Sequence, residues 1–325
     1  MPETLIDLQN LNKIFTFTSG IFNSQNRIVH AVQSINLQIW KGETLGLVGE
    51  SGCGKSTLAR LIVGLENPSS GFIFFQGDDI SSYDKRAMKI YRRNVQLIFQ
   101  DPYSSLNPRK SAISMVKEPL IIHRSGNSDE RRRQATELME KVGLSAEQAN
   151  RYPHEFSGGQ RQRIGIARAL ILQPQLIIAD EPVSALDVSV QAQILNLLKD
   201  LKQDFGLTYL FISHDLNVIR HMADRVAVMY LGQIVELAEN RDIYESPLHP
   251  YTQLLLSAVP DCNPRKKRKK VIIKDEIGHG GNRGCNFQDR CPYKLPLCKE
   301  QQPVLQEVNK QRFCACHLAG SIRMS

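Results

Sequence analysis

The residues with the clearest chemical potential form a glycine-rich run at positions 49–57, Gly-Glu-Ser-Gly-Cys-Gly-Lys-Ser-Thr. Its glycines let the backbone curl so that successive N–H groups point inward at phosphate oxygens. In this pattern the lysine reaches the β and γ phosphates of a nucleotide, and the hydroxyl that follows it binds Mg²⁺. The run predicts a nucleoside triphosphate site made by Gly49, Ser51, Gly52, Cys53, Gly54, Lys55, Ser56 and Thr57.

A pair of carboxylates, Asp180 and Glu181, ends an apolar run that begins at Leu176. Successive side chains of a strand point in opposite directions, so the two carboxylates are expected to have different tasks. Asp180 is expected to hold Mg²⁺ through water, and Glu181 to orient or deprotonate the water that attacks phosphorus. Loop and pair together predict metal-assisted hydrolysis of ATP.

Positioning these groups requires a strand, a turn and a helix. The apolar run 44–48 precedes the loop, and the helix-forming residues 57–62 follow it. The pattern predicts a strand that ends at the loop and a helix whose N-terminus faces the phosphates. A further strand is predicted over residues 176–181, and His214 follows another strand at residues 209–213.

A mostly helical segment is expected over residues 108–150. Within it, residues 130–141 are charged and strongly helix-forming, and Leu138, Met139 and Val142 can form an apolar stripe. For Leu138 and Val142 we favour core packing over a docking role.

Further motifs follow the loop: Gln100, then Phe156-Ser157-Gly158-Gly159-Gln160, then Pro182 after the carboxylates, then Ser184-Ala185-Leu186-Asp187, and His214. In these motifs and their order, the chain resembles the ATP-binding cassette (ABC) ATPases over about residues 5–260. Phe156 replaces the leucine that usually precedes the signature serine. The resemblance implies an α/β P-loop NTPase fold, with a mixed sheet core, an antiparallel β subdomain and a helical subdomain at about 101–165, in a domain spanning 1–260.

The resemblance also implies roles for individual residues. Two such domains would pair head to tail, so that the signature residues Ser157, Gly158, Gly159 and Gln160 complete the partner's ATP site. Glu181, His214 and Gln100 would be catalytic, with His214 on the γ phosphate and Gln100 sensing Mg²⁺ and the coupled membrane subunit. The expected Mg²⁺ ligands are Ser56, Gln100 and Asp180.

Two assignments complete this ATP site. Ser184 and Asp187 would belong to the D-loop, which lies between the two domains of the implied dimer. Phe15 is the preferred aromatic residue to stack on adenine, with Phe17 as its rival, and either residue could instead belong to the core. Cys53 is interpreted as a small filler inside the loop, where alkylation could block ATP.

Runs outside the generic motifs are similar to the ATPases of bacterial dipeptide and oligopeptide importers, of the second-ATPase type. They are residues 100–109, 188–193, 249–252 and the extended segment 16–30. This resemblance implies a heterodimer with a homologous ATPase, two integral membrane permease subunits and an extracytoplasmic substrate-binding protein. A nickel or other small-solute importer is the alternative. Residues 103–107, Tyr-Ser-Ser-Leu-Asn, are the preferred surface for contact with the permease.

Five of the seven cysteines lie near the end of the chain, at positions 285, 291, 298, 314 and 316. Their arrangement resembles the C-terminal motif of peptide-importer ATPases, which implies a [4Fe–4S] cluster held by Cys285, Cys291, Cys298 and Cys316, with Cys314 spare. Four thiolates also suit zinc, which is the alternative, and disulfides are disfavoured in the cytosol. Residues 261–325 are therefore expected to form a basic linker and a cysteine-rich extension.

Charge is uneven along the chain, whose net charge is +8. The segment from Cys262 holds 14 of the 41 Lys and Arg residues but 5 of the 33 Asp and Glu residues, chiefly because of the basic run 265–270. A solvated linker is the preferred interpretation of this run, followed by contact with lipid head groups. A soluble ABC ATPase acting on nucleic acid or ribosomes is a further alternative, disfavoured because only one loop and one signature occur.

The location of the chain is expected to be the cytoplasmic face of the inner membrane, with peripheral attachment. No apolar run approaches the roughly 20 residues that span a bilayer. The first residues, Met-Pro-Glu-Thr, lack the basic and apolar regions of a signal peptide.

Overall fold

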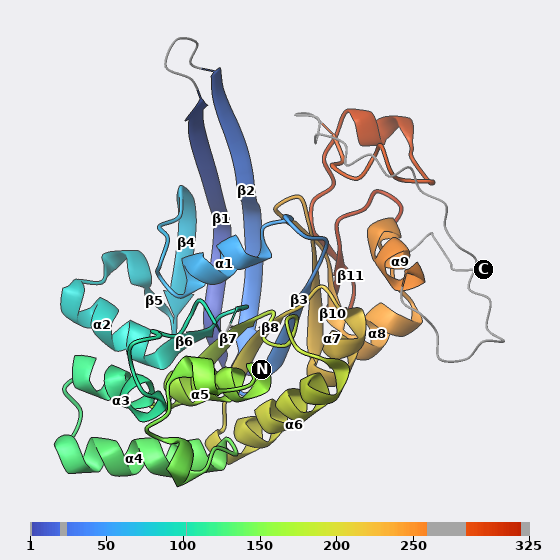
Figure 1. Ribbon diagram of the computed structural model, residues 1–325. Helices are drawn as coiled ribbons and strands as arrows, with labels where there is room; N and C mark the ends of the chain where they lie inside the picture. Colours follow the sequence, from blue (N-terminus) through green and yellow to red (C-terminus); the bar gives the residue numbers. More distant parts are fainter. Residues whose placement is uncertain (1, 20–24, 102, 259–283, 320–325) are drawn as a thin grey trace.

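The structure is a computed structural model that describes residues 2–19, 25–101, 103–258 and 284–319. Its strands form two sheets, one of four strands and one of eight, with helices packed along the larger sheet (Figure 1). The basic run 265–270 and the linker expected around it lie outside the described residues. The eight-stranded mixed sheet with its helices and the separate four-stranded antiparallel sheet agree with the predicted mixed sheet core and antiparallel β subdomain.

The eight-stranded sheet has the order β11-β12-β10-β9-β3-β8-β7-β6. The five strands from β9 to β6 are parallel, and β10, β12 and β11 continue the sheet by antiparallel pairing. Parallel neighbours end at the same edge, so the segments that follow them lie close together. The strands are β3 (Thr44–Val48), β6 (Val95–Ile98), β7 (Leu176–Asp180), β8 (Thr208–Ile212), β9 (Arg225–Tyr230), β10 (Gln233–Glu239), β11 (Gln306–Asn309) and β12 (Arg312–Cys314).

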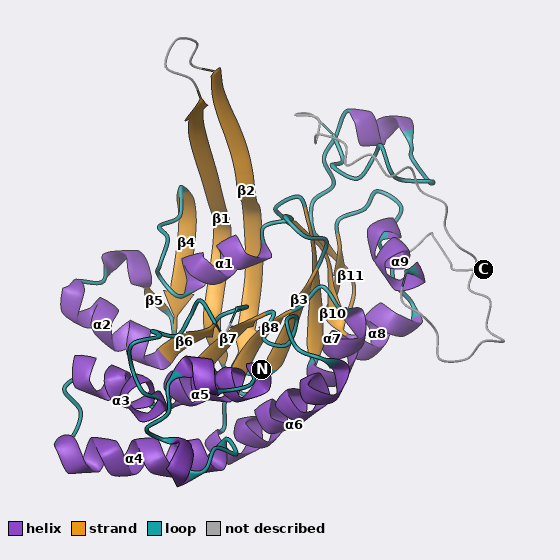
Figure 2. Ribbon diagram, in the orientation of Figure 1, coloured by secondary structure: helices purple, strands orange, loops and turns teal. Residues whose placement is uncertain are grey.

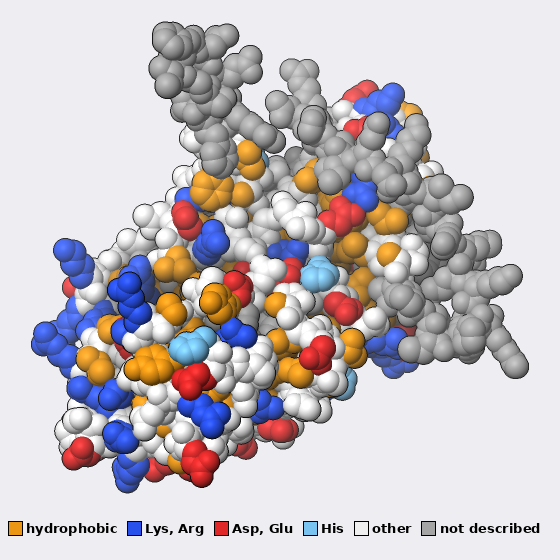
Figure 3. Space-filling model, viewed as in Figure 1, with side chains coloured by type: hydrophobic (Ala, Val, Ile, Leu, Met, Phe, Trp, Pro, Cys, Tyr) orange, Lys and Arg blue, Asp and Glu red, His pale blue; other side chains and the backbone are white. Residues whose placement is uncertain are grey.

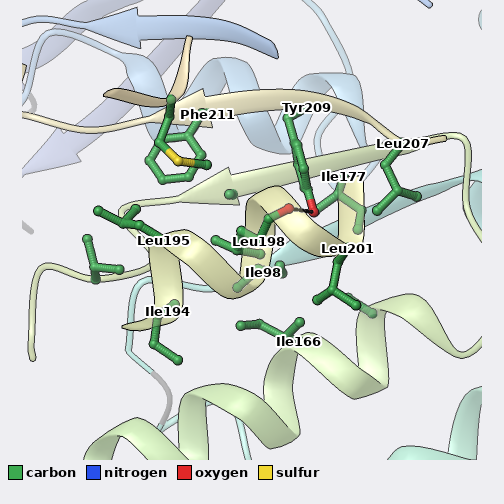
Figure 4. Packing of buried hydrophobic residues seen from close by; sticks show 14 of the residues in the cluster. Ile98, Ile166, Ile177, Ile194, Leu195, Leu198, Leu201, Leu207, Tyr209 and Phe211 are labelled. Carbon is green, nitrogen blue, oxygen red and sulfur yellow. Dashed lines mark hydrogen bonds between the residues drawn. The ribbon is translucent and has the colours of Figure 1, made fainter. Parts of the chain in front are cut away.

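Both faces of this sheet are covered by hydrophobic cores, as expected for buried parallel strands. Ile177 and Ala179 of β7 belong to one core, whereas Leu176 and Ile178 belong to the other. In the first core, Leu198 and Leu201 of helix α6 (Val188–Phe205) pack beside Tyr209, whose hydroxyl donates to the Leu198 carbonyl at 3.1 Å (Figure 4). The strands are therefore held in register from two sides.

The four-stranded sheet has the antiparallel order β2-β1-β4-β5. Its two long strands form a hairpin that projects beyond the other elements (Figure 2). Alternate residues of β2, among them Ile35, Leu37 and Ile39, are buried, because one face of the hairpin covers the second core. The strands are β1 (Thr4–Ser19), β2 (Gln25–Trp40), β4 (Ser70–Phe75) and β5 (Asp78–Asp79).

Six of the nine described α-helices begin after a residue whose side chain caps them. Helix α4 begins after Asn127, which accepts from the Glu130 backbone N–H while the Glu130 side chain accepts from the Asn127 backbone N–H. The helices are α1 (Lys55–Ile62), α2 (Lys85–Asn94), α3 (Ala112–Ile122), α4 (Ser128–Lys141), α5 (Gly158–Leu170), α6 (Val188–Phe205), α7 (Leu216–Met222), α8 (Asn240–Glu245) and α9 (Pro250–Ser257).

The segment expected to be mostly helical contains α3 and α4, and both pack on α5. Leu138, Met139 and Val142 are buried, which confirms core packing for the stripe. Leu106 is also buried, at 4% exposure, so the prediction that its side chain belongs to an exposed contact surface is wrong. Its apolar side chain joins the core around α3 and α5.

Residues 284–319 pack against the rest of the chain. Strand β12 pairs with β10, with Cys314 opposite Glu236 and Phe313 opposite Leu237. Phe287 is buried beside Tyr230 and Tyr251. Within the part of the chain that the structure describes, no helix is long and apolar enough to span a bilayer.

Candidate nucleotide site

The loop 49–57 joins β3 to α1, and two of its glycines are required by close backbone contacts. A Cβ atom on Gly49 would lie 2.2 Å from the carbonyl oxygen of Met229. One on Gly54, whose φ is +109°, would lie 2.1 Å from the carbonyl oxygen of Ala31. Because glycine has no side chain, strands β9 and β2 can pack directly against the loop backbone. The loop could not follow this course with a larger residue at either position.

The ammonium of Lys55 lies inside the curve of the loop. Its Nζ donates to the carbonyls of Gly49 at 2.8 Å and Glu50 at 2.9 Å, and lies 3.6 Å from the Cys53 sulfur. Cys53 is buried, and burial raises the pKa of its thiol, in agreement with a filler role. The helix N-terminus and the lysine together create a positive site suited to phosphate.

The two carboxylates at the end of β7, Asp180 within the strand and Glu181 directly after it, diverge as the strand pattern predicted. The Ser56 hydroxyl donates to Asp180 Oδ1 at 3.2 Å, which unites two of the expected Mg²⁺ ligands. Glu181 turns away, with φ +46°, and its N–H donates to the Ile212 carbonyl at 3.0 Å. Oxygen ligands of this kind suit Mg²⁺, so the Ser56–Asp180 pair fits the ion that ATP requires.

Three strand ends meet at the Glu181 carboxylate. Gln100, after β6, donates to Glu181 Oε2 at 2.9 Å, and His214 Nδ1, after β8, lies 3.1 Å from the same oxygen. Gln100, expected as a third Mg²⁺ ligand, thus bonds to Glu181 instead of the Ser56–Asp180 pair. The arrangement presents a carboxylate, held by an amide and an imidazole, that can accept a proton from water.

Burial of the Asp180 carboxylate lowers the free energy of unfolding by an amount that depends on pH. Desolvation raises the pKa of Asp180 above 3.8, although the Ser56 hydroxyl partly opposes this. A carboxyl group whose pKa is higher in the folded than in the unfolded protein stabilises the fold at pH values below its unfolded pKa. That contribution is lost as the pH rises through the folded pKa. We therefore expect Asp180→Asn, without Mg²⁺ and nucleotide, to be more stable than wild type at pH 7 and no more stable below pH 3.8.

Urea unfolding of both proteins across this pH range checks the expectation. Asp204→Asn provides a surface control, since the Asp204 side chain is 57% exposed in its pair with Lys141. A constant difference between wild type and Asp180→Asn at all pH values would contradict the assignment.

The signature residues form the start of helix α5. The Ser157 hydroxyl accepts from the Gln160 N–H at 3.3 Å, and the Gln160 side chain accepts from the Ser157 N–H at 3.0 Å. A Cβ on Gly159 would lie 2.5 Å from Val190 of α6, so glycine permits close packing of the two helix starts. Ser157 is exposed at the end of this helix pair, and Gly158 is half-buried.

The D-loop residues connect this end of the molecule to Glu181. The Ser184 hydroxyl donates to the Glu181 carbonyl at 3.1 Å. Asp187 caps α6 by accepting from the Val190 N–H at 3.0 Å, and this hydrogen bond lowers the pKa of its carboxyl. Both side chains are exposed.

The adenine candidate Phe15 lies half-buried in β1, with the Lys13 ammonium 4.9 Å from its ring centroid. The side chain of Phe17 lies outside the described residues. The choice between them stays a prediction.

Two contacts to Glu50 were missed by the sequence analysis. The Glu50 N–H donates to the Tyr251 hydroxyl at 2.8 Å, and Arg290 binds the Glu50 carboxylate through two hydrogen bonds of 2.8 Å. Residues 249–252 had served only as a mark of the importer group. Nothing in local spacing signals either contact, because 201 and 240 residues separate the partners.

The four cysteines expected to bind a cluster line one small cavity, together with His249 and Phe287. Burial raises the pKa of the Cys285 and Cys291 thiols to about 11. Among the described residues, no three His, Cys, Asp or Glu side chains are placed to hold a metal ion, so the side-chain positions support neither zinc nor the cluster. Cys314, the expected spare, is buried in β12 outside this cavity.

Comparison with known proteins agrees with this geometry. Residues 32–184 match the ABC transporter family, and residues 235–298 match the oligopeptide/dipeptide transporter C-terminal region. The dimeric ATP-binding cassette MJ0796 bound to ADP and Pi has a TM-score of 0.64 and 33% identity, over 73% of this chain and 99% of that one. Fold and site thus define an ABC ATPase, an enzyme whose ATP hydrolysis is coupled to transport.

Curated relatives cover nearly the whole chain. The oligopeptide transport ATP-binding protein AppF of Bacillus subtilis is 52% identical over 97% of this chain and 98% of that protein. The dipeptide transport ATP-binding protein DppF of Escherichia coli is 47% identical over 97% of this chain and 95% of that protein. The chain belongs to the ATP-binding subunits of ABC transporters, in the group that carries the oligopeptide/dipeptide transporter C-terminal region.

Proposed function

We propose that this chain hydrolyses ATP to drive the import of dipeptides or oligopeptides through partner membrane subunits. The observation that carries the proposal is the convergence of Gln100 and His214 on the Glu181 carboxylate, beside the Ser56–Asp180 pair. The peptide cargo is inferred from the names of AppF and DppF and from the matching C-terminal region.

Each residue has a task in this proposal. Lys55 and the amides of loop 49–57 bind the phosphates, and Phe15 stacks on adenine. Ser56 and Asp180 would hold Mg²⁺, and the ion would supply charge neutralisation at the phosphoryl group. Glu181 accepts the proton of the attacking water.

The two residues that contact Glu181 orient the hydrolysis. His214 and Gln100 hold the Glu181 carboxylate in place and meet the γ phosphate and Mg²⁺ as the nucleotide binds. Both reach Glu181 from strands that flank β7 in the sheet, β8 and β6 respectively. A closure of the ATPase dimer that shifts the end of β6 or β8 would therefore change the position of the Glu181 carboxylate directly.

The partner ATPase is proposed to complete this site from the other side. The signature residues at the start of α5 would face the γ phosphate bound by a homologous subunit: the exposed Ser157 with Gly158, Gly159 and Gln160. Ser184 and Asp187 are exposed near the same end and connect the interface to Glu181. Assembly would therefore control hydrolysis.

The membrane partners are proposed to be two permease subunits, with an extracytoplasmic binding protein delivering peptide. Hydrophobic side chains lie among Lys and Arg on the face over α2 and α3 (Figure 3). Tyr103 is 62% exposed and follows Gln100 closely, so a permease contact here would reach the Glu181 site through Gln100. The chain would sit peripherally on the cytoplasmic face of the membrane.

Peptide uptake tests the transport proposal. Cells whose only copy carries Glu181→Gln should lose uptake of labelled dipeptides and oligopeptides while the subunit remains on the membrane. Unchanged uptake, in a strain without a redundant system, would move the cargo to nickel or another small solute. Co-migration with ribosomes or DNA instead of membrane subunits would favour the nucleic-acid alternative.

We also propose the division of the chain into an ATPase domain, 1–260, and a cysteine-rich extension, 261–325, that holds a [4Fe–4S] cluster. Support comes from the single cavity shared by Cys285, Cys291, Cys298 and Cys316. No three of the described side chains are placed to hold a metal ion, so the proposal rests on this shared cavity and on the chemistry of four thiolates.

Anaerobically purified protein is expected to contain iron and to absorb visible light. Cys298→Ser should remove both signals, because it deletes one of four thiolate ligands. Cys314→Ala is the matched control and should keep the signals, since Cys314 lies outside the cavity. Protein with zinc and no iron would replace the cluster by the zinc alternative.

A further inference from the structure

Glu50 is the only acidic residue in the phosphate loop 49–57, and the fold holds it at three points. Its carboxylate accepts two hydrogen bonds from Arg290, each 2.8 Å long. Its N–H donates to the Tyr251 hydroxyl at 2.8 Å, and its carbonyl accepts from Lys55 Nζ at 2.9 Å. Both the side chain and the backbone of Glu50 are thus held in place.

Arg290 owes its position to the cysteine-rich segment 284–319. It directly precedes Cys291, and its backbone N–H donates to the Phe287 carbonyl at 3.1 Å. Its guanidinium carbon lies 5.8 Å from the ring centroids of both Phe287 and Tyr230, and its side chain is 9% exposed. The buried Phe287 ring anchors this turn against the core.

A free carboxylate in this loop would oppose phosphate binding, because like charges repel. A bidentate guanidinium neutralises that charge and fixes the direction of the carboxylate, which a single ammonium does less well. Glu50 also supplies one of the two backbone carbonyls that bind the Lys55 ammonium. Arg290 can therefore influence both the charge of the loop and the placement of its lysine.

We propose that Arg290 is a positioning residue of the ATP site, through which the folded cysteine-rich segment sets the affinity of the phosphate loop for ATP. This inference rests on the proposed role of loop 49–57 as the ATP site. It assigns to the C-terminal segment a direct effect on nucleotide binding, independent of any group that its cysteines hold.

Calorimetric titration of the full-length protein with Mg²⁺-ATP tests the inference. Arg290→Ala is expected to weaken binding about tenfold, since it leaves a charged hydrogen-bond acceptor without its partner. The KM for ATP should rise by a similar factor, with kcat within about twofold of wild type, because Arg290 does not touch Glu181 or His214. The ATP affinity of Arg290→Lys should lie between those of wild type and Arg290→Ala. This variant replaces Arg290→Ala in the test if the alanine variant does not fold.

The double variant Glu50→Gln with Arg290→Ala separates positioning from simple loss of structure. Removing the unpaired charge should restore much of the ATP affinity, whereas loss of the segment's fold would not be rescued. Arg312→Ala is the matched control, because Arg312 also ties this segment to the core, through Asp242 at 3.6 Å and the Ser246 carbonyl at 2.6 Å. Its ATP affinity should equal that of wild type.

Three results would overturn the inference: unchanged affinity in Arg290→Ala, equal losses in Arg290→Ala and Arg312→Ala, or no rescue by Glu50→Gln. A wild-type protein that binds no ATP would instead remove the proposed function itself. The two failures are therefore distinguishable.

Discussion

Replacing Glu181 with Gln is expected to lower ATP hydrolysis about 10²- to 10⁴-fold, the usual contribution of a general base. The amide keeps the shape of the side chain but cannot accept the proton of water. Binding of ATP should remain, because Glu181 contacts Gln100 and His214 and has no hydrogen bond to Lys55 among those described. Single-turnover hydrolysis and nucleotide titration of the same preparation measure the two effects separately.

A conservative replacement elsewhere controls for this experiment. Glu245→Gln changes an exposed glutamate of α8 that pairs with Arg241 at 2.8 Å, and it should leave hydrolysis unchanged. Wild-type cleavage by Glu181→Gln would remove Glu181 from its proposed role. Loss of ATP binding in that variant would show that Glu181 organises the phosphate loop as well.

Replacing Gly54 with Ala is expected to abolish ATP binding and to destabilise the protein. A residue other than glycine at a strained φ costs on the order of 1–3 kcal/mol. At Gly54, whose φ is +109°, the new Cβ would also lie 2.1 Å from the Ala31 carbonyl oxygen and 2.9 Å from Met229 Cε. Backbone cannot yield as a flexible side chain does, so the loop must move and lose its arrangement of N–H groups.

Gly42→Ala is the matched control for backbone strain. Gly42 has φ +78°, and a Cβ there would meet no atom within 4 Å. It should show a modest loss of stability with normal ATP binding. Thermal unfolding and ATP titration of the two variants measure the difference, and equal ATP binding by Gly54→Ala and wild type would contradict the steric argument.

The elements around the site could be predicted from the sequence because their signals are local. The apolar run 44–48 is strand β3, and helix α1 begins at Lys55 inside the glycine-rich loop. The two carboxylates lie at the end of β7, and Ser157 caps α5. Hydrophobic period, glycine and capping residues specify each of these within a few residues.

Exposure and pairing were harder to predict. Leu106 was expected on a contact surface and is buried, because helices α3 and α5 cover it. The hydrogen bond from Gln100 to Glu181 was not predicted, and the expected role of Gln100 as an Mg²⁺ ligand stays a prediction. In each case the neighbour that decides the outcome comes from a distant part of the chain.

By itself the sequence determined which groups are available for chemistry: a loop that can cradle phosphate, two carboxylates with expected roles toward metal and water, and a signature that opens a helix. Tertiary structure alone decided which of these groups meet. Glu181 meets Gln100 and His214 because β6, β7 and β8 are neighbours in the sheet, and Glu50 meets Arg290 because β12 and Phe287 fasten the last segment beside the loop. Local rules specify a residue's conformation, whereas strand order and packing specify its partners.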